Sequence, residues 1–284
     1  MNVFDRFARD NCLTIARVFD PALIDSVAAE VGRQFKGVDY GTRSDQLRVG
    51  KRRVQLPVQL RGPLLDPALY ANPLILQVVR SQLGDDFLID AFACIVAFPG
   101  AEDQGIHRDH DDLFMDRQEL RADLPPYAVT VMIPLIDLTP ETGGTRLFPG
   151  SQALSALEAR DGLTETDSEM TYLKRGGCYL MDYRLIHQGT ANRSNAPRTM
   201  LYIVYTRPWF TDSENFRRHS RITIDPADFE GIPDEHRPLF RRLAAPGGFD
   251  RSEKELLEDR AISIADPSTI TKLRPAQLSR RRLG

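Results

Sequence analysis

Residues 87–98 read FLIDAFACIVAF and form an apolar run of strand length. A second run, AVTVMIPLIDL at residues 128–138, has aliphatic side chains at alternate positions from Val129 to Leu135, which places them on one face of an extended chain. Three shorter runs follow between clusters of glycine, proline and asparagine: TRLF at 145–148, CYLMDY at 178–183 and RTMLYIVYT at 198–206. Short strands between such turn signals predict an antiparallel β barrel or sandwich.

The residues before this β region predict helices. Asp20 is a candidate N-cap, Pro21 suits the first helical position, and the apolar residues of 22–35 recur at helical spacing. A second helix is predicted over 66–84, restarting at Pro73 and ending at a glycine. We therefore expect one domain over 1–284, with a helical part at about 1–86, a β core at about 87–210 and a polar C-terminal extension at about 211–284.

The composition excludes several classes of protein. The chain has 284 residues, of which 42% are hydrophobic and 27% charged, and its net charge of −3 indicates neither nucleic acid nor a membrane surface as partner. It contains no apolar run of membrane-spanning length. Its three cysteines are far apart and odd in number, which disfavours a disulfide framework or a structural zinc site and favours a reducing, cytoplasmic location. A monomer and a homodimer are both compatible with the sequence.

One basic segment stands out at residues 40–62. Its simplest interpretation is a solvated loop or hairpin. The alternative is a flap that meets an anionic substrate, with Arg52 and Arg53 as the substrate-binding candidates.

Residues 107–112 read HRDHDD and contain two His-x-Asp pairs, His107 with Asp109 and His110 with Asp112. Residues two apart on an extended chain point to the same face, so either pair could supply two ligands to a metal ion. Two histidines and one carboxylate on one side of an iron ion leave open positions for O₂ and for a bidentate organic ligand. The spacing alone does not choose between the two pairs.

The third ligand is predicted to be His187. Of the remaining histidines, His219 and His236 lie in charged tail segments and are expected to be exposed, whereas His187 follows the run GGCYLMDYRLI and precedes a polar turn. Arg198 opens the next strand, eleven residues later. A keto acid such as 2-oxoglutarate would chelate iron at one end, and its far carboxylate would need a fixed partner. The planar guanidinium of arginine suits that role.

Together these pieces resemble the phytanoyl-CoA dioxygenase family of Fe(II)- and 2-oxoglutarate-dependent oxygenases. The resemblance covers roughly residues 10–207. Its motifs are Gln104-x-x-His107-x-Asp109, ThrGlyGlyThr at 142–145, PheProGlySer at 148–151, and His187 with Asn192 and Arg198. The sequence departs from the family pattern at Gln152, where histidine is frequent, and at Cys178, where aspartate is frequent.

The resemblance selects one of the two pairs. In the family a glutamine precedes the first metal histidine by three residues, which implies His107, Asp109 and His187 as metal ligands. His110 falls one register out; it would contact the substrate, support the site or simply be exposed, while Asp111 and Asp112 are expected to stay solvated.

The resemblance also implies roles for polar residues around the metal and for the fold. Arg198 and Thr145 would bind 2-oxoglutarate, and Gln104 would bind it or line the pocket. Gly143, Gly144 and Gly150 would permit tight turns. The implied fold is mainly β with flanking helices, built on a double-stranded β-helix (a cupin-like jelly roll).

The implied activity uses Fe(II), 2-oxoglutarate and O₂ to hydroxylate a C–H bond of a small-molecule or natural-product substrate, releasing succinate and CO₂. Desaturation or ring closure would use the same residues. The alternative is a metal-binding cupin without redox chemistry, such as a hydrolase, an isomerase or a binding module, but it leaves Arg198 unexplained. A nucleic-acid dealkylase is disfavoured by the acidic net charge.

Overall fold

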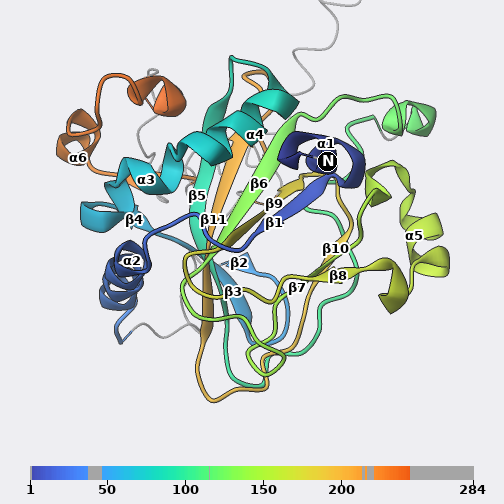
Figure 1. The fold of residues 1–284 in the computed structure, drawn as a ribbon, viewed down its shortest axis with the longest axis horizontal. Helices are drawn as coiled ribbons and strands as arrows, with labels where there is room; N and C mark the ends of the chain where they lie inside the picture. The colour runs from blue at the N-terminus through green and yellow to red at the C-terminus, as the bar shows by residue number, and fades with distance from the viewer. Residues whose placement is uncertain (1, 38–46, 115, 213–214, 216–220, 244–284) are drawn as a thin grey trace, which may run out of the picture.

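The computed structural model describes residues 2–37, 47–114, 116–212, 215 and 221–243. Its centre is a seven-stranded sheet in the order β1-β9-β6-β11-β5-β3-β2, and each neighbouring pair is antiparallel (Figure 1). The strands of this sheet are β1 (Cys12–Ile15), β2 (Leu47–Arg48), β3 (Arg53–Pro57), β5 (Leu88–Ala97), β6 (Ala128–Pro134), β9 (Cys178–Asp182) and β11 (Arg198–Thr206).

Two smaller sheets and a set of helices flank the large sheet. One small sheet has the order β10-β7-β8, and the other is a parallel pair of β12 and β4. These strands are β4 (Gln59–Leu60), β7 (Thr145–Leu147), β8 (Glu169–Met170), β10 (His187–Gly189) and β12 (Thr223–Ile224). The helices are α1 (Val3–Asp10), α2 (Pro21–Gln34), α3 (Pro67–Tyr70), α4 (Pro73–Leu83), α5 (Ala156–Gly162) and α6 (Pro226–Glu230).

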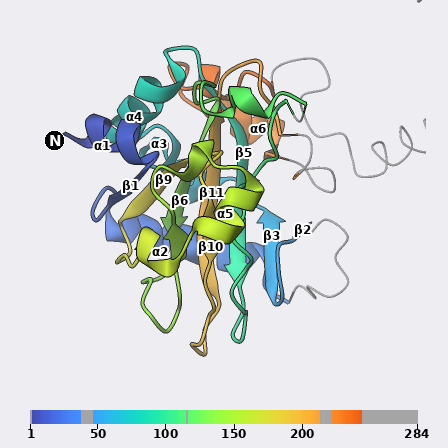
Figure 2. The ribbon, with the colours of Figure 1, turned by 90° about the vertical axis from the view of Figure 1, so that its right-hand side faces the viewer.

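The large sheet is buried on both faces. In Figure 1, α2 and α3 lie to the left of the large sheet, α4 crosses in front of its upper part, and the β7–β8–β10 sheet lies to the right. Figure 2 looks from the right-hand side, with α5 and β10 in front. On β6, Val129, Val131 and Ile133 pack in the helix-side core, whereas Ala128 and Met132 pack in a second apolar cluster. The expected jelly roll is therefore confirmed, with a layer of side chains enclosed between the two sheets.

The predicted helices are confirmed. Asp20 caps α2 by accepting a hydrogen bond from the Ala22 amide at 2.9 Å, and Ile24, Val27 and Val31 are buried on one face. The second predicted helix is two helices, α3 and α4, and the restart occurs at Pro73. None of the helices in the described ranges is long and apolar enough to cross a membrane.

The prediction that residues 1–86 are helical was incomplete. The segment also contributes β1, which pairs with β9, and β3, which pairs with β5, so the core sheet draws on the whole chain up to Thr206. β1, CLTI, has only four residues and no clear alternation of polar and apolar residues. β3, RVQLP, does alternate, but it lies in the basic segment that was interpreted as a loop or hairpin. The β2–β3 pair makes the predicted hairpin within residues 40–62, although 40–46 lie outside the described residues.

Residues 221–243 of the C-terminal extension form β12, α6 and a short 3-10 turn at Arg237–Phe240. Phe240 is fully buried in the helix-side core. This part of the extension therefore completes the core as well as wrapping the outside. Residues 244–284 lie outside the described part of the chain.

Candidate active site

The two histidines predicted to bind metal are joined through their main chains. His107 follows the turn after β5, and His187 opens β10. Their backbones form an isolated antiparallel bridge, in which the His107 amide donates to the His187 carbonyl at 3.0 Å and the His187 amide donates back at 2.8 Å. The bridge brings the two rings to a centroid separation of 4.4 Å. Residues 80 positions apart in sequence are thereby fixed side by side.

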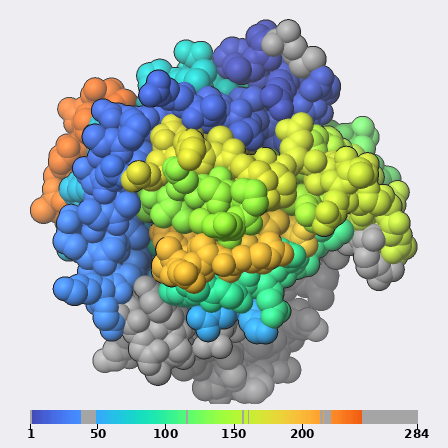
Figure 3. Space-filling view, turned by 60° about the horizontal axis from the view of Figure 1, so that its bottom comes forward, coloured from blue at the N-terminus to red at the C-terminus, as the bar shows by residue number. Residues whose placement is uncertain are grey.

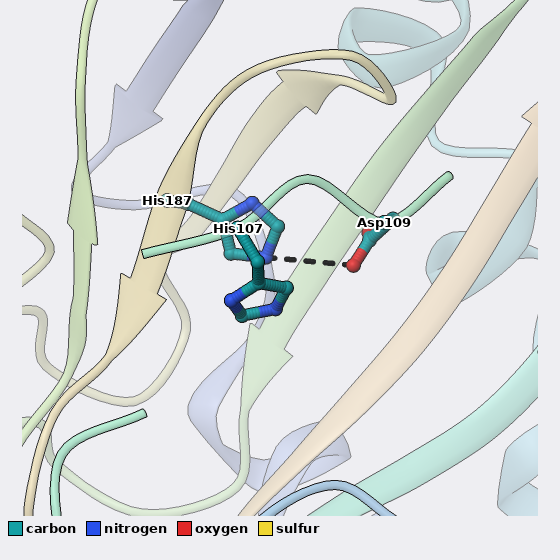
Figure 4. Close-up of side chains that lie close together, drawn as sticks. All are labelled: His107, Asp109 and His187. Atoms are coloured by element: carbon teal, nitrogen blue, oxygen red, sulfur yellow. Dashed lines mark ion pairs between the residues drawn. The ribbon is translucent and has the colours of Figure 1, made fainter. Parts of the chain in front are cut away.

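Asp109 completes a cluster with these histidines (Figure 4). One potential ligand atom from each of the three residues lies within 4.8 Å of the others, and Asp109 Oδ1 is 3.4 Å from His187 Nε2. His107 Nδ1 is 2.9 Å from the Gly105 carbonyl oxygen, and His187 Nδ1 is 3.0 Å from that of Leu185. Because a carbonyl only accepts, each Nδ1 carries a proton, which leaves Nε2 as the nitrogen of each ring that can bind a metal ion.

The electrostatics suit a metal site. Burial, with the neighbouring His187, lowers the pKa of His107 to about 4, so this imidazole is neutral at pH 7. Burial alone would lower the pKa of His187, but the Asp109 carboxylate outweighs it and raises that pKa above 6.5. Burial would raise the pKa of Asp109, but the two histidines hold it below 3.8. Two imidazoles and one carboxylate form a donor set that fits a divalent iron.

A cavity of about 500 Å³ opens beside this cluster. All three cluster residues line it, as do Arg53 and Arg198. Its apolar wall includes Ile95, Met132, Met181 and Met200, which come from four neighbouring strands of the large sheet. The cavity is large enough for a small organic molecule beside the cluster.

Arg198 is almost fully buried at the start of β11. Its Nη1 donates to the carbonyl oxygens of Thr142 and Thr190, at 3.0 and 2.9 Å. Gly143 leaves room for this guanidinium: it has φ +76°, and a Cβ at this position would lie 2.3 Å from Arg198 Nη1. Figure 3 shows the segments near residues 100, 140 and 190 side by side over this end of the molecule, where Asn192 and Arg193 bond to Ala101 and Glu141.

Arg53 lies in the same part of the cavity, whereas Lys51, Arg52 and Arg61 of the basic segment are exposed, as expected for most of it. Its exposed fraction is 2%, and its Nη2 donates to the Thr190 carbonyl at 2.8 Å, the same oxygen that Arg198 contacts. Both arginines pair with Ala97 of β5, one from each side. Burial, with the nearby Arg198, lowers the pKa of Arg53 to about 10.

Arg52 does not share this position. It adopts a left-handed conformation with φ 55°, is exposed, and donates from Nε to the Pro99 carbonyl at 2.6 Å. It is absent from the cavity wall, so the structure gives no support to Arg52 as a substrate-binding residue. The candidate pair from the basic segment is thus reduced to Arg53.

Thr145 and Gln104 both line the cavity, as expected. Thr145 Oγ1 lies 2.6 Å from the Tyr179 hydroxyl on β9. Gln104 uses both ends of its amide on the main chain, donating to the Val49 carbonyl at 2.6 Å and accepting from the Gly189 amide at 3.1 Å. Its visible role is to tie the β2–β3 hairpin to β10.

The second His-x-Asp pair lies outside the cavity wall. His110 packs against Phe210, with a ring separation of 5.3 Å. Asp112 is paired with Arg108 at 3.0 Å and also with Arg121, so the expectation that Asp112 stays solvated was wrong. Asp111 is exposed, as expected.

The tail histidine His236 takes no part in the cluster found among the described residues. His236 was expected to be exposed but is half-buried, with its ring 6.0 Å from that of Tyr70. His219 lies outside the described residues.

The cavity wall also includes polar residues that were not predicted, among them Tyr179, Tyr202 and Asn215. Tyr202 had a signal, because it shares the inward face of its strand with Arg198 and Met200. Tyr179 sits in a short, fully buried strand, which shows no alternation. Asn215 follows the last strand of the large sheet and had no local signal.

Comparison with known proteins gives a consistent result. The family model described as phytanoyl-CoA dioxygenase matches residues 7–200. Dioxygenase af480 of Aspergillus fumigatus is 29% identical over 146 residues, covering 49% of this chain and 44% of the relative. Multifunctional dioxygenase ausE of Emericella nidulans is 25% identical over 197 residues, covering 65% of each protein. The chain thus spans less than two thirds of these two relatives.

Solved structures share the fold. HygX of Streptomyces hygroscopicus, solved with nickel and 2-oxoglutarate, has a TM-score of 0.56 and 17% identity, covering 78% of this chain and 96% of HygX. The epimerase SnoN, solved with Fe3+, alpha ketoglutarate and nogalamycin RO, has a TM-score of 0.56 and 18% identity, covering 72% of this chain and 82% of SnoN. At these identities the likeness concerns the fold.

Proposed function

Because the chain belongs to the phytanoyl-CoA dioxygenase family, we propose that it is an Fe(II)- and 2-oxoglutarate-dependent dioxygenase acting on a small organic molecule. The observation that carries this proposal is the pairing of two features in one cavity. One is the His107–Asp109–His187 cluster, and the other is the buried pair Arg53 and Arg198. The first suits a divalent metal ion, and the second suits a carboxylate.

The two arginines are a costly arrangement without a ligand. Both are almost fully buried and both donate to the Thr190 carbonyl, so two positive charges converge on one place. Among the described residues, no carboxylate forms an ion pair with either one, and Arg198 Nε, Arg53 Nε and Arg53 Nη1 have no hydrogen-bond partner. The Asp103 carboxylate, which lines the same cavity, attracts both guanidiniums but forms no ion pair with either, so it compensates their buried charges only in part. The far carboxylate of 2-oxoglutarate would supply the missing charge and acceptors.

The residues of this chain would divide the work as follows. His107, Asp109 and His187 would hold the iron, and the Gly105 and Leu185 carbonyls orient the two imidazoles for that role. When bound, the iron supplies the activation of O₂, coupled to decarboxylation of 2-oxoglutarate to succinate. Arg198 would bind the far carboxylate by paired hydrogen bonds, with Arg53 beside it. The apolar wall around Met200 would exclude water from the reacting groups.

The substrate is proposed only as a class. The cavity of about 500 Å³ must hold both the keto acid and the reacting part of the substrate. Its two histidines, Arg53 and Arg198 are assigned to the other ligands, and the remaining wall combines methionine and isoleucine with polar residues such as Gln55, Asp103 and Tyr202. A small molecule or natural product that presents an unactivated C–H bond fits this wall, and hydroxylation of that bond is the proposed outcome.

The alternative, a metal-binding cupin without redox chemistry, would use the same metal cluster. This alternative does not explain why two buried arginines converge beside that cluster. The two functions are separated by incubating the purified protein with Fe(II), 2-oxoglutarate and O₂ and measuring succinate. We expect succinate that depends on iron, even without substrate, and its loss in Asp109→Ala. Wild-type protein that binds iron but forms no succinate, with or without a panel of natural-product substrates, would favour the alternative.

A further inference from the structure

The metal-cluster carboxylate is held by residues that lie beyond the family match, which ends at residue 200. Asp109 directs Oδ1 toward His187, and its other oxygen, Oδ2, lies 3.4 Å from the Tyr202 hydroxyl. Tyr202 is buried on β11, two strand positions past Met200 on the cavity side. The two oxygens of the carboxylate are therefore in different environments.

Tyr202 is itself part of a ring of polar contacts. Its hydroxyl oxygen is 3.2 Å from the Tyr183 hydroxyl, and Tyr183 donates to Asp212 Oδ2 at 2.5 Å. Asp212 Oδ2 accepts from Asn215 Nδ2 at 2.7 Å, and the same Asn215 amide group donates to the main-chain carbonyl of Asp109. We call these five residues (Asp109, Tyr202, Tyr183, Asp212 and Asn215) the Asp109 ring.

The direction of the bonds follows from the number of hydrogens. Each phenol has one hydroxyl hydrogen, and a carboxylate is a stronger acceptor than another hydroxyl. Tyr183 therefore donates to Asp212, and Tyr202 donates to Asp109. The arrangement satisfies both carboxylates and leaves Asp109 Oδ1 as the oxygen that faces the histidines.

The far side of the ring is anchored to the large sheet. The Asp212 amide donates to Asp90 Oδ2 at 3.2 Å, and Thr211 Oγ1 donates to Asp90 Oδ1 at 3.0 Å. Asp90 lies on β5 and is also paired with Arg242 from the C-terminal extension. The ring thus connects the metal cluster to a rigid strand through the segment that follows β11.

We infer that the Asp109 ring positions the metal-binding carboxylate: Tyr202 fixes its Oδ2, so that Oδ1 alone faces the metal position, and Asn215 fixes its main chain. The inference rests on the proposed function, because it assumes that Asp109 is a metal ligand. Of the four residues that support Asp109, three (Tyr202, Asp212 and Asn215) lie beyond the family match, and Tyr183 lies within it. These are positioning residues, since they act through Asp109.

The test measures Co(II) binding, which needs no turnover. Tyr202→Phe removes only the hydroxyl, and Asn215→Ala removes the amide that holds the main chain. Loss of a partner of a metal ligand typically lowers metal affinity by about 10- to 100-fold, so we expect such a loss in each variant, with an altered visible spectrum of bound Co(II). The double variant should lose less than the product of the two single losses, because both act on one residue.

Tyr205→Phe is the matched control. Tyr205 is buried on the same strand, in the helix-side core, and its hydroxyl donates to the Tyr70 carbonyl at 2.6 Å. The Tyr205→Phe variant should have a lower thermal unfolding midpoint but a Co(II) affinity within about twofold of the wild-type value. Wild-type Co(II) affinity and spectrum in both Tyr202→Phe and Asn215→Ala, with binding lost in Asp109→Ala, would overturn this inference alone. Absence of Co(II) binding in the wild type would overturn the proposed function and this inference with it.

Discussion

The two His-x-Asp pairs of residues 107–112 have the same spacing and opposite surroundings. His107 and Asp109 meet His187 at a cavity, whereas His110 packs on Phe210 and lies outside the cavity wall. The difference arises from the backbone, because the bridge between His107 and His187 fixes which register faces inward. Which of the two His-x-Asp pairs faces the cavity is therefore decided by the pairing with His187 on β10 and not by the local sequence.

The carboxylates of the two pairs differ in the same way. Asp109 lies beside two imidazoles and the Tyr202 hydroxyl, which leaves it free to take a metal ion. Asp112 lies between the guanidiniums of Arg108 and Arg121, which satisfy its charge fully. We therefore expect changes in the first pair to alter metal binding and changes in the second to alter stability.

The largest effect is expected from Asp109→Ala compared with Asp112→Ala. Removing Asp109 deletes a metal bond and should reduce Co(II) affinity by more than the roughly 100-fold typical of losing a ligand's supporting partner. Asp112→Ala should bind Co(II) with an affinity within about threefold of the wild type. Titration of Co(II) monitored by its visible spectrum measures both. Equal losses of Co(II) affinity in the two variants would show that Asp109 and Asp112 do not differ in their role in metal binding.

Arg198→Ala should produce the next largest effect, on the keto acid instead of the metal. Loss of a buried bidentate partner costs about 2–5 kcal/mol, and Arg198→Lys should recover only part because a point charge does not reproduce the guanidinium fork. The measurement is the affinity of the Ni(II)-loaded protein for 2-oxoglutarate. An unchanged affinity in Arg198→Ala would mean that another residue binds the far carboxylate.

Asp112→Asn should act on stability. The substitution removes the charge that pairs with Arg108 and Arg121, and we expect a loss of about 1–3 kcal/mol in the free energy of unfolding at pH 7. Hydrogen bonds from Arg121 lower the pKa of Asp112 below its usual 3.8. A lowered folded pKa means that the contribution is present above the unfolded pKa and is lost as pH falls through the folded value.

Urea unfolding at several pH values tests this directly. The difference between wild type and Asp112→Asn should be constant from pH 7 to about 5 and should shrink below about pH 3.8. A difference that persists unchanged at pH 3 would show that charge pairing is not its source. Co(II) affinity should stay near the wild-type value throughout the neutral range.

The neighbours Arg52 and Arg53 repeat the contrast on a smaller scale. Arg53→Ala should weaken 2-oxoglutarate binding by about tenfold, since its guanidinium lies in the cavity but already donates to the Glu102 and Thr190 carbonyls. Arg52→Ala should change the affinity by less than about twofold, because its side chain bonds to Pro99 on the outside. A larger loss of 2-oxoglutarate affinity in Arg52→Ala than in Arg53→Ala would contradict the assignment of Arg53 to the binding site.

Much of this site could be predicted from the sequence. The long strands β5, β6 and β11 have strong apolar patterns, Arg198 follows a turn signal at a strand start, and His187 lies between an apolar run and a polar turn. The ligands that iron requires then favour His187 among the remaining histidines, and the far carboxylate of a keto acid favours Arg198 as its partner. The choice of register at His107 came from the resemblance, because the period-two pattern fits both pairs equally.

The remainder depends on contacts between distant segments. Burial of Arg53 requires β3 to pair with β5, and the charge of Asp112 is met by Arg121 on a 3-10 turn. The Asp109 ring joins residues from four parts of the chain, with the Asn215 contact 106 positions away from Asp109. No local period marks such contacts, so sequence reasoning placed Asp112 in solvent and overlooked Asn215.

The most direct test of the central claim compares His107→Ala with His110→Ala. Each protein is loaded anaerobically with Fe(II) and 2-oxoglutarate, and the visible charge-transfer absorption of the complex is recorded together with iron content. The register described above predicts that His110→Ala retains the band and the iron, whereas His107→Ala loses both. Loss of the band in His110→Ala with its retention in His107→Ala would contradict the assignment and move the metal site to the other His-x-Asp pair.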